Sequence, residues 1–396
     1  MSRKRVLFLT TRFPYPPIGG DKLKAFNLLK IMSKHYDVKL IAWSYFKLPK
    51  DSYLELIKSL GVEVEVLRLN PFKAALNCGL KLFSGLPFEI SFYNLSEFRK
   101  AVETSVKYDK IDVVVAFFMR SGEFVKNMQI KKLLVAEDCR TLYQKRSYEQ
   151  TDKFLQKIVR YHEWKKLHKY EKSMMDKFDA VSFVTEHDIS SIKNINPHGN
   201  YKLLTNGTDV EHYKDSSKRE PYTLLFAGKM NVHSNQISAI QLAKEILPVV
   251  AKAVPEVKLI IAGADMNAEI RNLASDKIEI IENVSDMLPQ YQRATIFVNP
   301  HRGGSGIQNK LLEALACGCS VITTITGIQG INGIDGEHLI IANDSTDFAR
   351  KIIKLLGDED LRAKIGTQAR KLILETHTWD VVELQLLSIM NGILNE

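Results

Sequence analysis

The chain has 396 residues, 45% of them hydrophobic and 26% charged, and a net charge of +9, values typical of a soluble globular protein with two or three domains. It contains no apolar run of about eighteen residues and only a short apolar stretch after its basic start, so neither a membrane span nor a secretory signal is predicted. The four cysteines, Cys78, Cys139, Cys317 and Cys319, fit neither a disulfide framework nor a paired zinc site, which predicts a reducing, cytoplasmic setting.

Short apolar runs alternate with longer amphipathic stretches along the whole chain. In the first half, strands are expected at residues 6–9, 38–43, 62–66, 113–118, 133–136 and 181–184. In the second half, they are expected at residues 224–227, 259–262, 278–281, 296–298, 321–323 and 339–341. Helices are expected between them, among them residues 22–32, one long helix over 148–176, 237–253 and 308–316. Apolar strands that alternate with helices indicate parallel sheets covered on both faces.

Two such series in tandem predict an α/β protein with two doubly wound, Rossmann-like domains. The turn signal Asn206-Gly207 and a polar stretch over 214–220 place the domain boundaries at residues 1–205 and 206–378. A C-terminal helix over 379–396 is expected to follow and could return to the first domain. Such sheets bind ligands beyond the carboxyl ends of their strands, so two of them facing each other across a cleft would form a site between domains.

A glycine loop follows the first predicted strand. Gly19 and Gly20 precede a helix that has Asp21 near its N-cap, and Lys22 lies directly behind them. Arg12 begins the same loop, so its position at a strand's carboxyl end favours contact with a ligand over a purely rigid connection. Further along, Asp138 ends another strand, where it either contacts an acceptor, orients arginines or caps a helix.

The segment after residues 296–298 combines glycines, cations and a carboxylate. Its glycines let the backbone approach a ligand closely: Gly303, Gly304 and Gly306. A helix expected to begin near Gly306 would direct its N–H groups and positive dipole end at a diphosphate. Arg302 and Lys310 add positive charge, and Glu313 offers a carboxylate to ribose hydroxyls from the same helical face. The alternative is a strand-to-helix turn in which Lys310 and Glu313 form a surface pair.

This segment resembles the donor-binding segment of glycosyltransferase family four, a retaining family with the two-domain GT-B fold. The likeness continues in family order over most of the chain and is strongest over residues 222–330; the similar segments are 14–24, 161–188, 206–209, 226–235, 245–248, 261–263, 320–324 and 327–330. It implies transfer of a sugar from a nucleotide-diphosphate sugar to a glycan or lipid-linked acceptor, with retention, in bacterial surface polysaccharide synthesis. The nucleotide sugar would be a co-substrate, and no cofactor is expected.

The resemblance also implies roles for individual residues. The groups expected to act in catalysis, by offsetting charge on the departing diphosphate, are Lys229, Arg302, Lys310 and Arg120. The residues expected to bind the donor are Gly19, Gly20, Asn231, Val284, Gly303, Gly304, Ser305, Gly306, Asn309 and Glu313. The residues expected to contact the acceptor are Arg12, Lys22 and Asp138. For Lys229, which follows a strand, an ordinary turn lysine is the alternative.

Two departures from the family pattern leave the donor sugar open. Many members carry two glutamates separated by seven residues; Glu313 fits the second, but Ser305 occupies the first position. The chain instead resembles a subgroup that reads Gly-x-Gly-Ile-x-Asn-Lys-x-Leu-Glu-Ala. The family's histidine is also absent near residues 117–120, where Arg120 is the candidate to take over part of its role.

No metal site is predicted. The acidic run over residues 358–360 stands in a polar turn away from any strand end and is expected to cap a helix near Leu361. His162, Glu163 and His168 lack the His-Glu-x-x-His spacing of zinc proteases. A solvated amphipathic helix is favoured there, with a membrane-surface role second.

Charge is unevenly spread: residues 1–200 hold 35 Lys and Arg against 22 Asp and Glu, whereas residues 201–396 hold 20 against 24. The basic half favours an anionic partner, which makes peripheral contact with the inner face of a membrane one candidate, or else it is simply a solvated surface. Nucleic acid is not expected, because no interleaved aromatics or recognised motif accompany the charge. A nucleotide-sugar epimerase of the same fold and a non-catalytic nucleotide- or carbohydrate-binding protein are the alternative functions.

Overall fold

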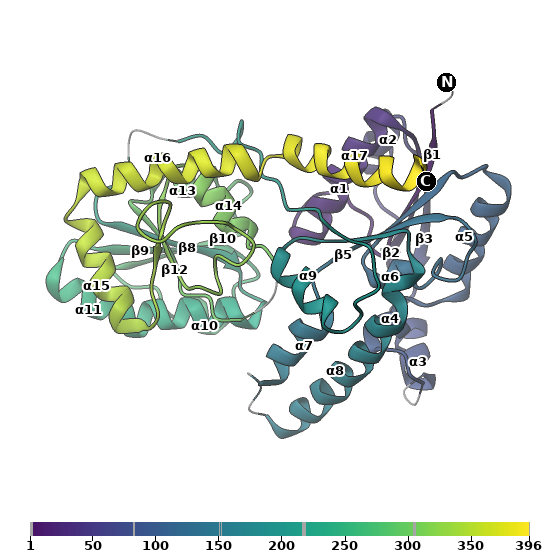
Figure 1. The fold of residues 1–396 in the computed structure, drawn as a ribbon. Helices are drawn as coiled ribbons and strands as arrows, with labels where there is room; N and C mark the ends of the chain where they lie inside the picture. Colours follow the sequence, from purple (N-terminus) through teal and green to yellow (C-terminus); the bar gives the residue numbers. More distant parts are fainter. Residues whose placement is uncertain are drawn as a thin grey trace. The chain divides into compact units, whose positions relative to one another are not determined.

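The computed structural model describes residues 3–81, 84–149, 151, 153–215, 219–303 and 306–395. The chain divides into two compact units. The first contains Met1–Thr205 and Val382–Glu396, and the second contains Asn206–Val381. Each unit has its own parallel sheet (Figure 1). Each unit also has its own apolar core.

The first unit is built on a seven-stranded parallel sheet. In sheet order its strands are β3 (Glu63–Leu69), β2 (Asp37–Tyr45), β1 (Arg5–Thr10), β4 (Val113–Phe117), β5 (Lys131–Glu137), β6 (Ala180–Phe183) and β7 (Tyr201–Leu203). Six of these were expected from apolar runs, and they are apolar because helices cover both faces of the sheet. The edge strand β7 was missed because its three residues, with Lys202 at the centre, form no apolar run.

The second unit is built on a six-stranded parallel sheet. In sheet order its strands are β10 (Ile278–Glu282), β9 (Lys258–Ala264), β8 (Thr223–Lys229), β11 (Ile296–Asn299), β12 (Ser320–Thr323) and β13 (Ile340–Ile341). All six coincide with expected strands. Together the two sheets confirm the prediction of two parallel-sheet α/β domains.

The helices of the first unit are α1 (Gly20–His35), α2 (Asp51–Ser59), α3 (Pro71–Leu80), α4 (Phe88–Tyr93), α5 (Ser96–Tyr108), α6 (Met119–Gly122), α7 (Arg140–Glu149), α8 (Phe154–Met174) and α9 (Glu186–Lys193). The expectation of one helix over residues 148–176 was wrong, because the chain forms two helices there. The Thr151 hydroxyl donates to the Ser147 carbonyl at 2.6 Å, which satisfies one of the carbonyls that the C-terminal end of α7 leaves without a helical partner.

The helices of the second unit are α10 (His233–Gln241), α11 (Leu247–Ala253), α12 (Ala268–Arg271), α13 (Leu288–Arg293), α14 (Asn309–Ala316), α15 (Ser345–Leu356) and α16 (Glu359–Thr376). A π-helical turn over Leu242–Ile246 joins α10 to α11, so the expected helix over residues 237–253 is continuous. Asp358 caps α16 by accepting a hydrogen bond from the Leu361 amide at 2.9 Å, as expected. None of the helices in the described residues is both long and apolar enough to cross a membrane.

The last helix, α17 (Trp379–Asn395), packs with the first unit. Its Glu383 carboxylate contacts Lys34 at 2.6 Å and His35 at 2.7 Å, both at the end of α1. Its Gln385 side chain accepts a hydrogen bond from the Thr205 amide at 2.9 Å. The chain therefore enters the first unit a second time after it has completed the second.

A buried ion pair lies within the first unit. The Lys24 side chain of α1 is almost fully buried; its Nζ lies 2.9 Å from a Glu137 carboxylate oxygen and 2.6 Å from the Leu204 carbonyl. Burial lowers the pKa of Lys24 and raises the pKa of Glu137. The pair joins α1 to the carboxyl end of β5 and to the segment that follows β7.

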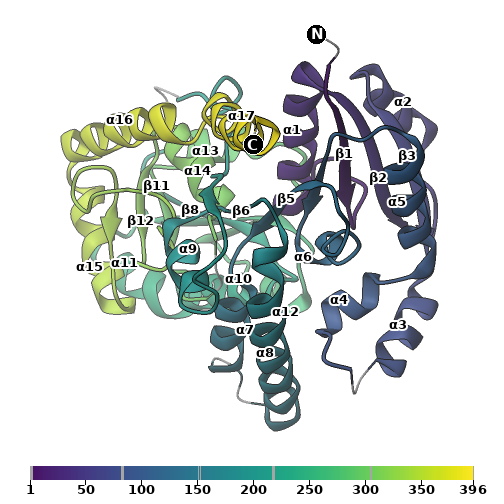
Figure 2. The ribbon, with the colours of Figure 1, turned by 45° about the vertical axis from the view of Figure 1, so that its right-hand side comes forward.

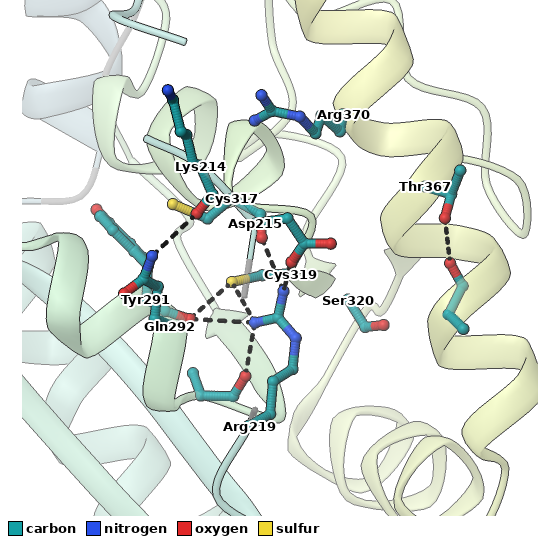
Figure 3. A network of polar contacts seen from close by, with 12 residues as sticks. Lys214, Asp215, Arg219, Tyr291, Gln292, Cys317, Cys319, Ser320, Thr367 and Arg370 are labelled. Carbon is teal, nitrogen blue, oxygen red and sulfur yellow. Dashed lines mark hydrogen bonds and ion pairs between the residues drawn. The ribbon is translucent and has the colours of Figure 1, made fainter. Parts of the chain in front are cut away.

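Two arginines hold the C-terminal end of α14 in the second unit. The Arg219 guanidinium donates to the carbonyls of Tyr291 at 3.1 Å, Ala294 at 2.9 Å and Cys317 at 2.7 Å (Figure 3). Arg370, on α16, donates to the Tyr213 carbonyl at 2.8 Å and to the carbonyl of Ala316, the last residue of α14. These bonds satisfy carbonyl groups that a helix end leaves without a partner.

Arg219→Ala should therefore lower the free energy of unfolding of the second unit by about 3 kcal/mol, because several largely buried carbonyls lose a charged donor. Urea denaturation of the whole chain measures this loss. The matched control is Arg271→Ala, since Arg271 pairs with Glu282 at 2.7 Å on the surface and should have little effect. Equal destabilisation by the two variants would show that the Arg219 network adds nothing beyond a surface pair.

Candidate functional site

Each sheet reverses its strand order at one point, between β1 and β4 in the first unit and between β8 and β11 in the second. Doubly wound sheets bind ligands beyond the carboxyl ends of their strands at such a point. In the second unit Lys229 ends β8, and the segment after β11 leads to α14. The predicted donor-binding segment is therefore located at the switch point of its sheet.

The helix after the glycine segment, α14, matches the expected helix over residues 308–316, but it does not reach back to Gly306. It starts at Asn309, with Gln308 as its N-cap residue, rather than near Gly306. Gly306 has a φ of +75°, outside the helical region, which explains the difference. Gly304 and Ser305 lie outside the described residues, whereas Gly303 is buried in a bend. Asn309 is fixed by its side-chain oxygen, which accepts a hydrogen bond from Asn206 at 2.9 Å.

Lys310 and Lys229 meet at one corner of the second unit through Asn235 of α10. The Lys310 Nζ donates to the Asn235 Oδ1 at 3.0 Å and lies 4.5 Å from the centre of the Phe226 ring. Asn235 in turn donates to the Lys229 carbonyl at 2.9 Å. Burial lowers the pKa of Lys310 to about 7. A buried cation whose contacts are an amide and a ring would gain from an anionic ligand.

Glu313 lies one turn further along α14 and has different partners. The Tyr291 hydroxyl donates to its carboxylate at 2.7 Å, and the Tyr213 hydroxyl also hydrogen-bonds to it. Burial raises the pKa of Glu313 to about 7. Lys310 and Glu313 therefore do not form the surface pair that was the alternative. The carboxylate is oriented by two phenols, which leaves it acceptor capacity for ligand hydroxyls.

The titration of Glu313 predicts a pH dependence of stability. Because its pKa is raised from 4.5 to about 7 in the folded chain, the native state holds more protons than the unfolded state between these values. The contribution of Glu313 to the free energy of unfolding is therefore present below pH 4.5 and is lost as the pH rises to about 7. Glu313→Gln cannot titrate, so its melting temperature relative to the wild type should rise between pH 4.5 and 7. A difference independent of pH would contradict the assignment.

The remaining predicted residues of the second unit lie around this corner with separate partners. Arg302 is exposed and donates to the Asn343 carbonyl at 3.2 Å. The Asn231 side chain donates to Asp265, after β9, at 2.8 Å. Val284 is half-buried in the loop after β10. The structure thus connects the Lys229 backbone with the Lys310 side chain through Asn235, and Glu313 lies on α14 together with Lys310. Arg302 and Asn231 contact other residues.

His301 is a residue that sequence reasoning missed. Its side chain is only 3% exposed, and the Thr324 hydroxyl donates to its backbone carbonyl. Burial and the nearby charge of Lys310 lower the pKa of His301 to about 4, so the imidazole is neutral at pH 7. Asn235, Tyr213 and Tyr291 were missed as well. Asn235 lies at the end of the segment 226–235 that resembles the family, but nothing in the spacing of the two tyrosines linked them to Glu313.

In the first unit, Arg12, Lys22 and Arg120 line one small recess at the carboxyl ends of β1 and β4. Gly19 is the N-cap residue of α1, with a φ of +98°, and Gly20 is its first helical residue. Asp21 lies in the first turn of α1, near the N-cap as expected, and its carboxylate pairs with Arg12 at 2.9 Å. This pair fixes the glycine loop against the end of β1.

Asp138 belongs to a second charged cluster. Its carboxylate lies 3.3 Å from Arg140, which pairs with Glu89 of α4 at 2.8 Å. Arg120 lies over the Phe118 ring at 4.5 Å, and its charge is one cause of a lowered pKa at Glu89. Asp138 therefore orients an arginine.

The alternative that Asp138 caps a helix was wrong. The amides at the start of α7 are instead bound by Glu171, which accepts from Arg140 at 2.9 Å and from Thr141 at 3.0 Å. Burial raises the pKa of Glu171 to about 7. The sequence could not show this, because Glu171 lies on α8, far along the chain.

A cavity of 510 Å³ adjoins the glycine loop of the first unit. Arg12 and Lys22 line it together with aromatic residues: Phe13, Tyr15, Trp43, Tyr45 and Tyr53. Aromatic faces with a few charged groups suit the apolar faces and hydroxyls of a sugar. A larger cavity of 680 Å³ lies beside Thr295 and Ser320, at the starts of β11 and β12, so it is not at the switch point. Within the described residues, no cluster of three or more His, Cys, Asp or Glu could hold a metal ion.

The candidate site of the second unit lies in a part of the chain that is similar to known proteins. Residues 221–358 match the family model described as glycosyl transferases group 1. The chain is 26% identical over 198 residues to phosphatidyl-myo-inositol mannosyltransferase of Mycolicibacterium smegmatis, covering 47% of this chain and 50% of that protein. It is 34% identical over 122 residues to the capsular polysaccharide biosynthesis glycosyltransferase CapM of Staphylococcus aureus, covering 30% of this chain and 32% of that protein. The matches thus span half or less of these two relatives.

The fold is similar to that of solved structures over nearly the whole chain. Anabaena HepE, solved in complex with UDP and glucose, matches with a TM-score of 0.70 and 13% identity, covering 98% of this chain and 100% of that chain. This likeness confirms the predicted GT-B fold class of two parallel-sheet α/β domains.

Proposed function

We propose that the chain is a retaining glycosyltransferase that moves a sugar from a nucleotide-diphosphate sugar to a glycan or lipid-linked acceptor. The observation that carries this proposal is the corner formed by Lys229, Asn235 and Lys310 at the switch point of the second sheet, with Glu313 one turn along the same helix. The corner lies within the segment that matches group 1 glycosyltransferases. UDP and glucose in the HepE structure support a nucleotide-sugar donor.

The proposed chemistry is electrostatic. As the bond from the sugar to the diphosphate breaks, negative charge builds on the leaving nucleoside diphosphate and the sugar becomes oxocarbenium-like. Lys310, Lys229 and Arg302, with the first amides of α14, would stabilise that charge. Glu313 would accept hydrogen bonds from the ribose hydroxyls. The departing phosphate would take the proton of the acceptor hydroxyl on the same face of the sugar, which gives retention without an added metal.

The first unit is proposed to bind the acceptor. Its aromatic cavity supplies surfaces for a sugar, and Arg12 and Lys22 supply charge for a phosphate of a lipid carrier. The capsular role in the name of CapM supports synthesis of a bacterial surface polysaccharide, and the basic first half of the sequence supports action at the inner face of a membrane. Arg120 lines the small recess beside Arg12 and Lys22, and Asp138 is proposed to contact the acceptor together with its partner Arg140.

The test is thermal-shift binding of a panel of nucleotide sugars and nucleoside diphosphates, with and without EDTA. A ligand that binds the native state raises the melting temperature. We expect a shift for one nucleotide family that EDTA does not change and that Glu313→Ala removes. No shift with any nucleotide would overturn the donor assignment.

Turnover assays then separate transfer from epimerisation. A transferase should release nucleoside diphosphate in proportion to added acceptor, whereas an epimerase would convert the donor sugar without any acceptor. If the nucleotide sugar binds but neither transfer nor epimerisation occurs with any acceptor of a panel, a non-catalytic binding protein is favoured. That alternative arises because Ser305 occupies the position of the family's first glutamate.

A further inference from the structure

Large apolar side chains are exposed in a row on α3. Phe72, Leu76 and Leu80 are 80%, 65% and 78% exposed. Their spacing of four residues places them one above another on a single helical face. Asn77 and Ala74, on the other side of the helix, face the unit: Asn77 donates to the Ser91 carbonyl at 2.5 Å, and Ala74 is buried. The apolar row of α3 is therefore turned to solvent, while Asn77 and Ala74 face the protein.

The beginning of α8 has the same character. Phe154, Leu155, Ile158 and Val159 are 75%, 76%, 42% and 54% exposed. They form two neighbouring rows, each with a spacing of four residues, over the first turns of the helix. Further along α8 the apolar residues instead face the core, where Leu167 is buried. Contiguous exposed apolar faces of this kind mark interaction surfaces in monomeric proteins.

The two helices are held on one support. The Cys78 thiol of α3 donates to the Phe88 carbonyl of α4 at 3.5 Å. The Phe88 amide donates to the Glu163 carboxylate of α8 at 2.8 Å, and Lys166 of α8 lies over the Phe88 ring at 4.8 Å. Both views of the ribbon show α3 and α8 extending from the same end of the first unit (Figures 1 and 2). The two helices that carry exposed apolar side chains are therefore at the same end of the first unit.

The charge of α8 selects the kind of partner. Its two acidic residues, Glu163 and Glu171, are 6% and 0% exposed. Its six basic residues are exposed or half-buried: Lys157, Arg160, Lys165, Lys166, Lys169 and Lys172. The charge that α8 shows to solvent is thus positive, and α3 contains no acidic residue. Apolar side chains beside lysine and arginine are the pattern of a helix that lies in the interface of an anionic membrane.

We propose that these apolar faces, which we call the apolar tip (Phe72, Leu76, Leu80, Phe154, Leu155, Ile158 and Val159), dock the first unit onto an anionic lipid bilayer. The tip's side chains enter the headgroup and upper acyl region, while the lysines and arginines contact lipid phosphates. The inference rests on the proposed function and deepens it, because α4, which contacts both α3 and α8, also contacts the charged residues near the predicted acceptor site. Glu89 of α4 pairs with Arg140, and the Tyr93 ring lies 5.1 Å from Arg120. A lipid-linked acceptor in that bilayer would lie beside these groups.

Flotation of the full chain with lipid vesicles tests the docking surface. The probes are vesicles of phosphatidylcholine alone and of phosphatidylcholine mixed with phosphatidylglycerol. We expect binding to the mixed vesicles, weaker binding to the neutral ones, and loss of affinity with added salt. The variants Phe72→Ser with Leu76→Ser, and Phe154→Ser with Leu155→Ser, should each lower the partition coefficient by about tenfold or more.

Matched controls use apolar residues exposed elsewhere. Ile237→Ser on α10 and Leu384→Ser on α17, which are 50% and 70% exposed, should leave flotation unchanged. Phe72→Trp gives a second measurement, because its fluorescence should shift to the blue when anionic vesicles are added. The replaced side chains are exposed, so unchanged melting curves are expected and would show that the variants are folded.

Three outcomes would overturn the proposal: no binding of the wild type to mixed vesicles, flotation unchanged in both double variants, or a dimer in sedimentation velocity that the double variants abolish. The last would assign the tip to a second copy of the chain. The nucleotide-induced thermal shift, measured in the same variants, keeps the two proposals separate. Variants that lose flotation but keep the nucleotide-induced thermal shift would support both the docking surface and the donor site. Wild-type protein that floats with vesicles but shows no thermal shift with any nucleotide would support the docking surface and contradict the donor site.

Discussion

Lys310→Met should lower the turnover number by about a hundredfold or more while it raises the melting temperature. The loss is expected because a preorganised cation beside the leaving diphosphate is worth several kcal/mol in the transition state, at about 1.4 kcal/mol for each factor of ten. The gain in stability is expected because the Lys310 ammonium is buried against Asn235 and the Phe226 ring, and methionine removes its desolvation cost. Initial rates at saturating donor and a thermal melt measure the two effects.

The pH dependence of the stability gain gives an independent check. Burial lowers the pKa of Lys310 to about 7 from a usual 10.5, so between these values the unfolded chain binds more protons than the native chain. The free energy of unfolding of the wild type should therefore rise with pH across this window relative to Lys310→Met, and the advantage of the variant should shrink. Lys252→Met, on the far end of α11, is the control for loss of a surface lysine and should change neither rate nor pH dependence. A full-rate Lys310→Met enzyme would remove Lys310 from the mechanism.

Glu313→Ala should weaken donor binding by about 30- to 100-fold, since two hydrogen bonds from ligand hydroxyls to a charged acceptor are lost. Isothermal titration with the nucleoside diphosphate alone measures this loss, because Glu313 is predicted to contact the ribose of the nucleotide and not the sugar that is transferred. The affinity for inorganic pyrophosphate should change little.

A control is needed because the same replacement leaves the Tyr213 and Tyr291 hydroxyls without their acceptor. Tyr291→Phe removes one phenol and keeps the carboxylate. If it weakens nucleotide binding several-fold, the phenol positions Glu313; if it lowers only the melting temperature, the phenol is structural. Equal loss of pyrophosphate and nucleotide affinity in Glu313→Ala would contradict the ribose assignment.

The sheets were predictable because burial on both faces leaves one physical signature, a continuous apolar run. Every strand with such a run was found, and β7, which lacks one, was missed. The glycine segment and the residues on α14 were predictable for a related reason, since residues close in sequence there are close in space. Lys310 and Glu313 were recognised together because they share one helix.

Contacts between distant segments were not predictable from the sequence. Asn235 comes to Lys310 from α10, Tyr291 comes to Glu313 from α13, and Glu171 caps α7 from α8. Each of these partners is an ordinary polar residue in its own segment, and only the packing of the helices on the sheet gives it a role. The apolar pattern located α14 to within one residue, whereas the expectation that the helix begins near Gly306 was wrong because the conformation of Gly306 depends on a loop and not on a helical pattern.

The return of α17 to the first unit fixes an order of events during synthesis. Residues 206–381 have all left the ribosome before the α17 residues that pack with α1 appear, and α17 buries Leu386 and Met390 in that unit. Domains fold as units during translation, in general from the N-terminus. Here the unit that is begun first is the one completed last, so a chain that has emerged from the ribosome only as far as residue 381 should contain a folded second unit and a first unit that is still accessible to chaperones.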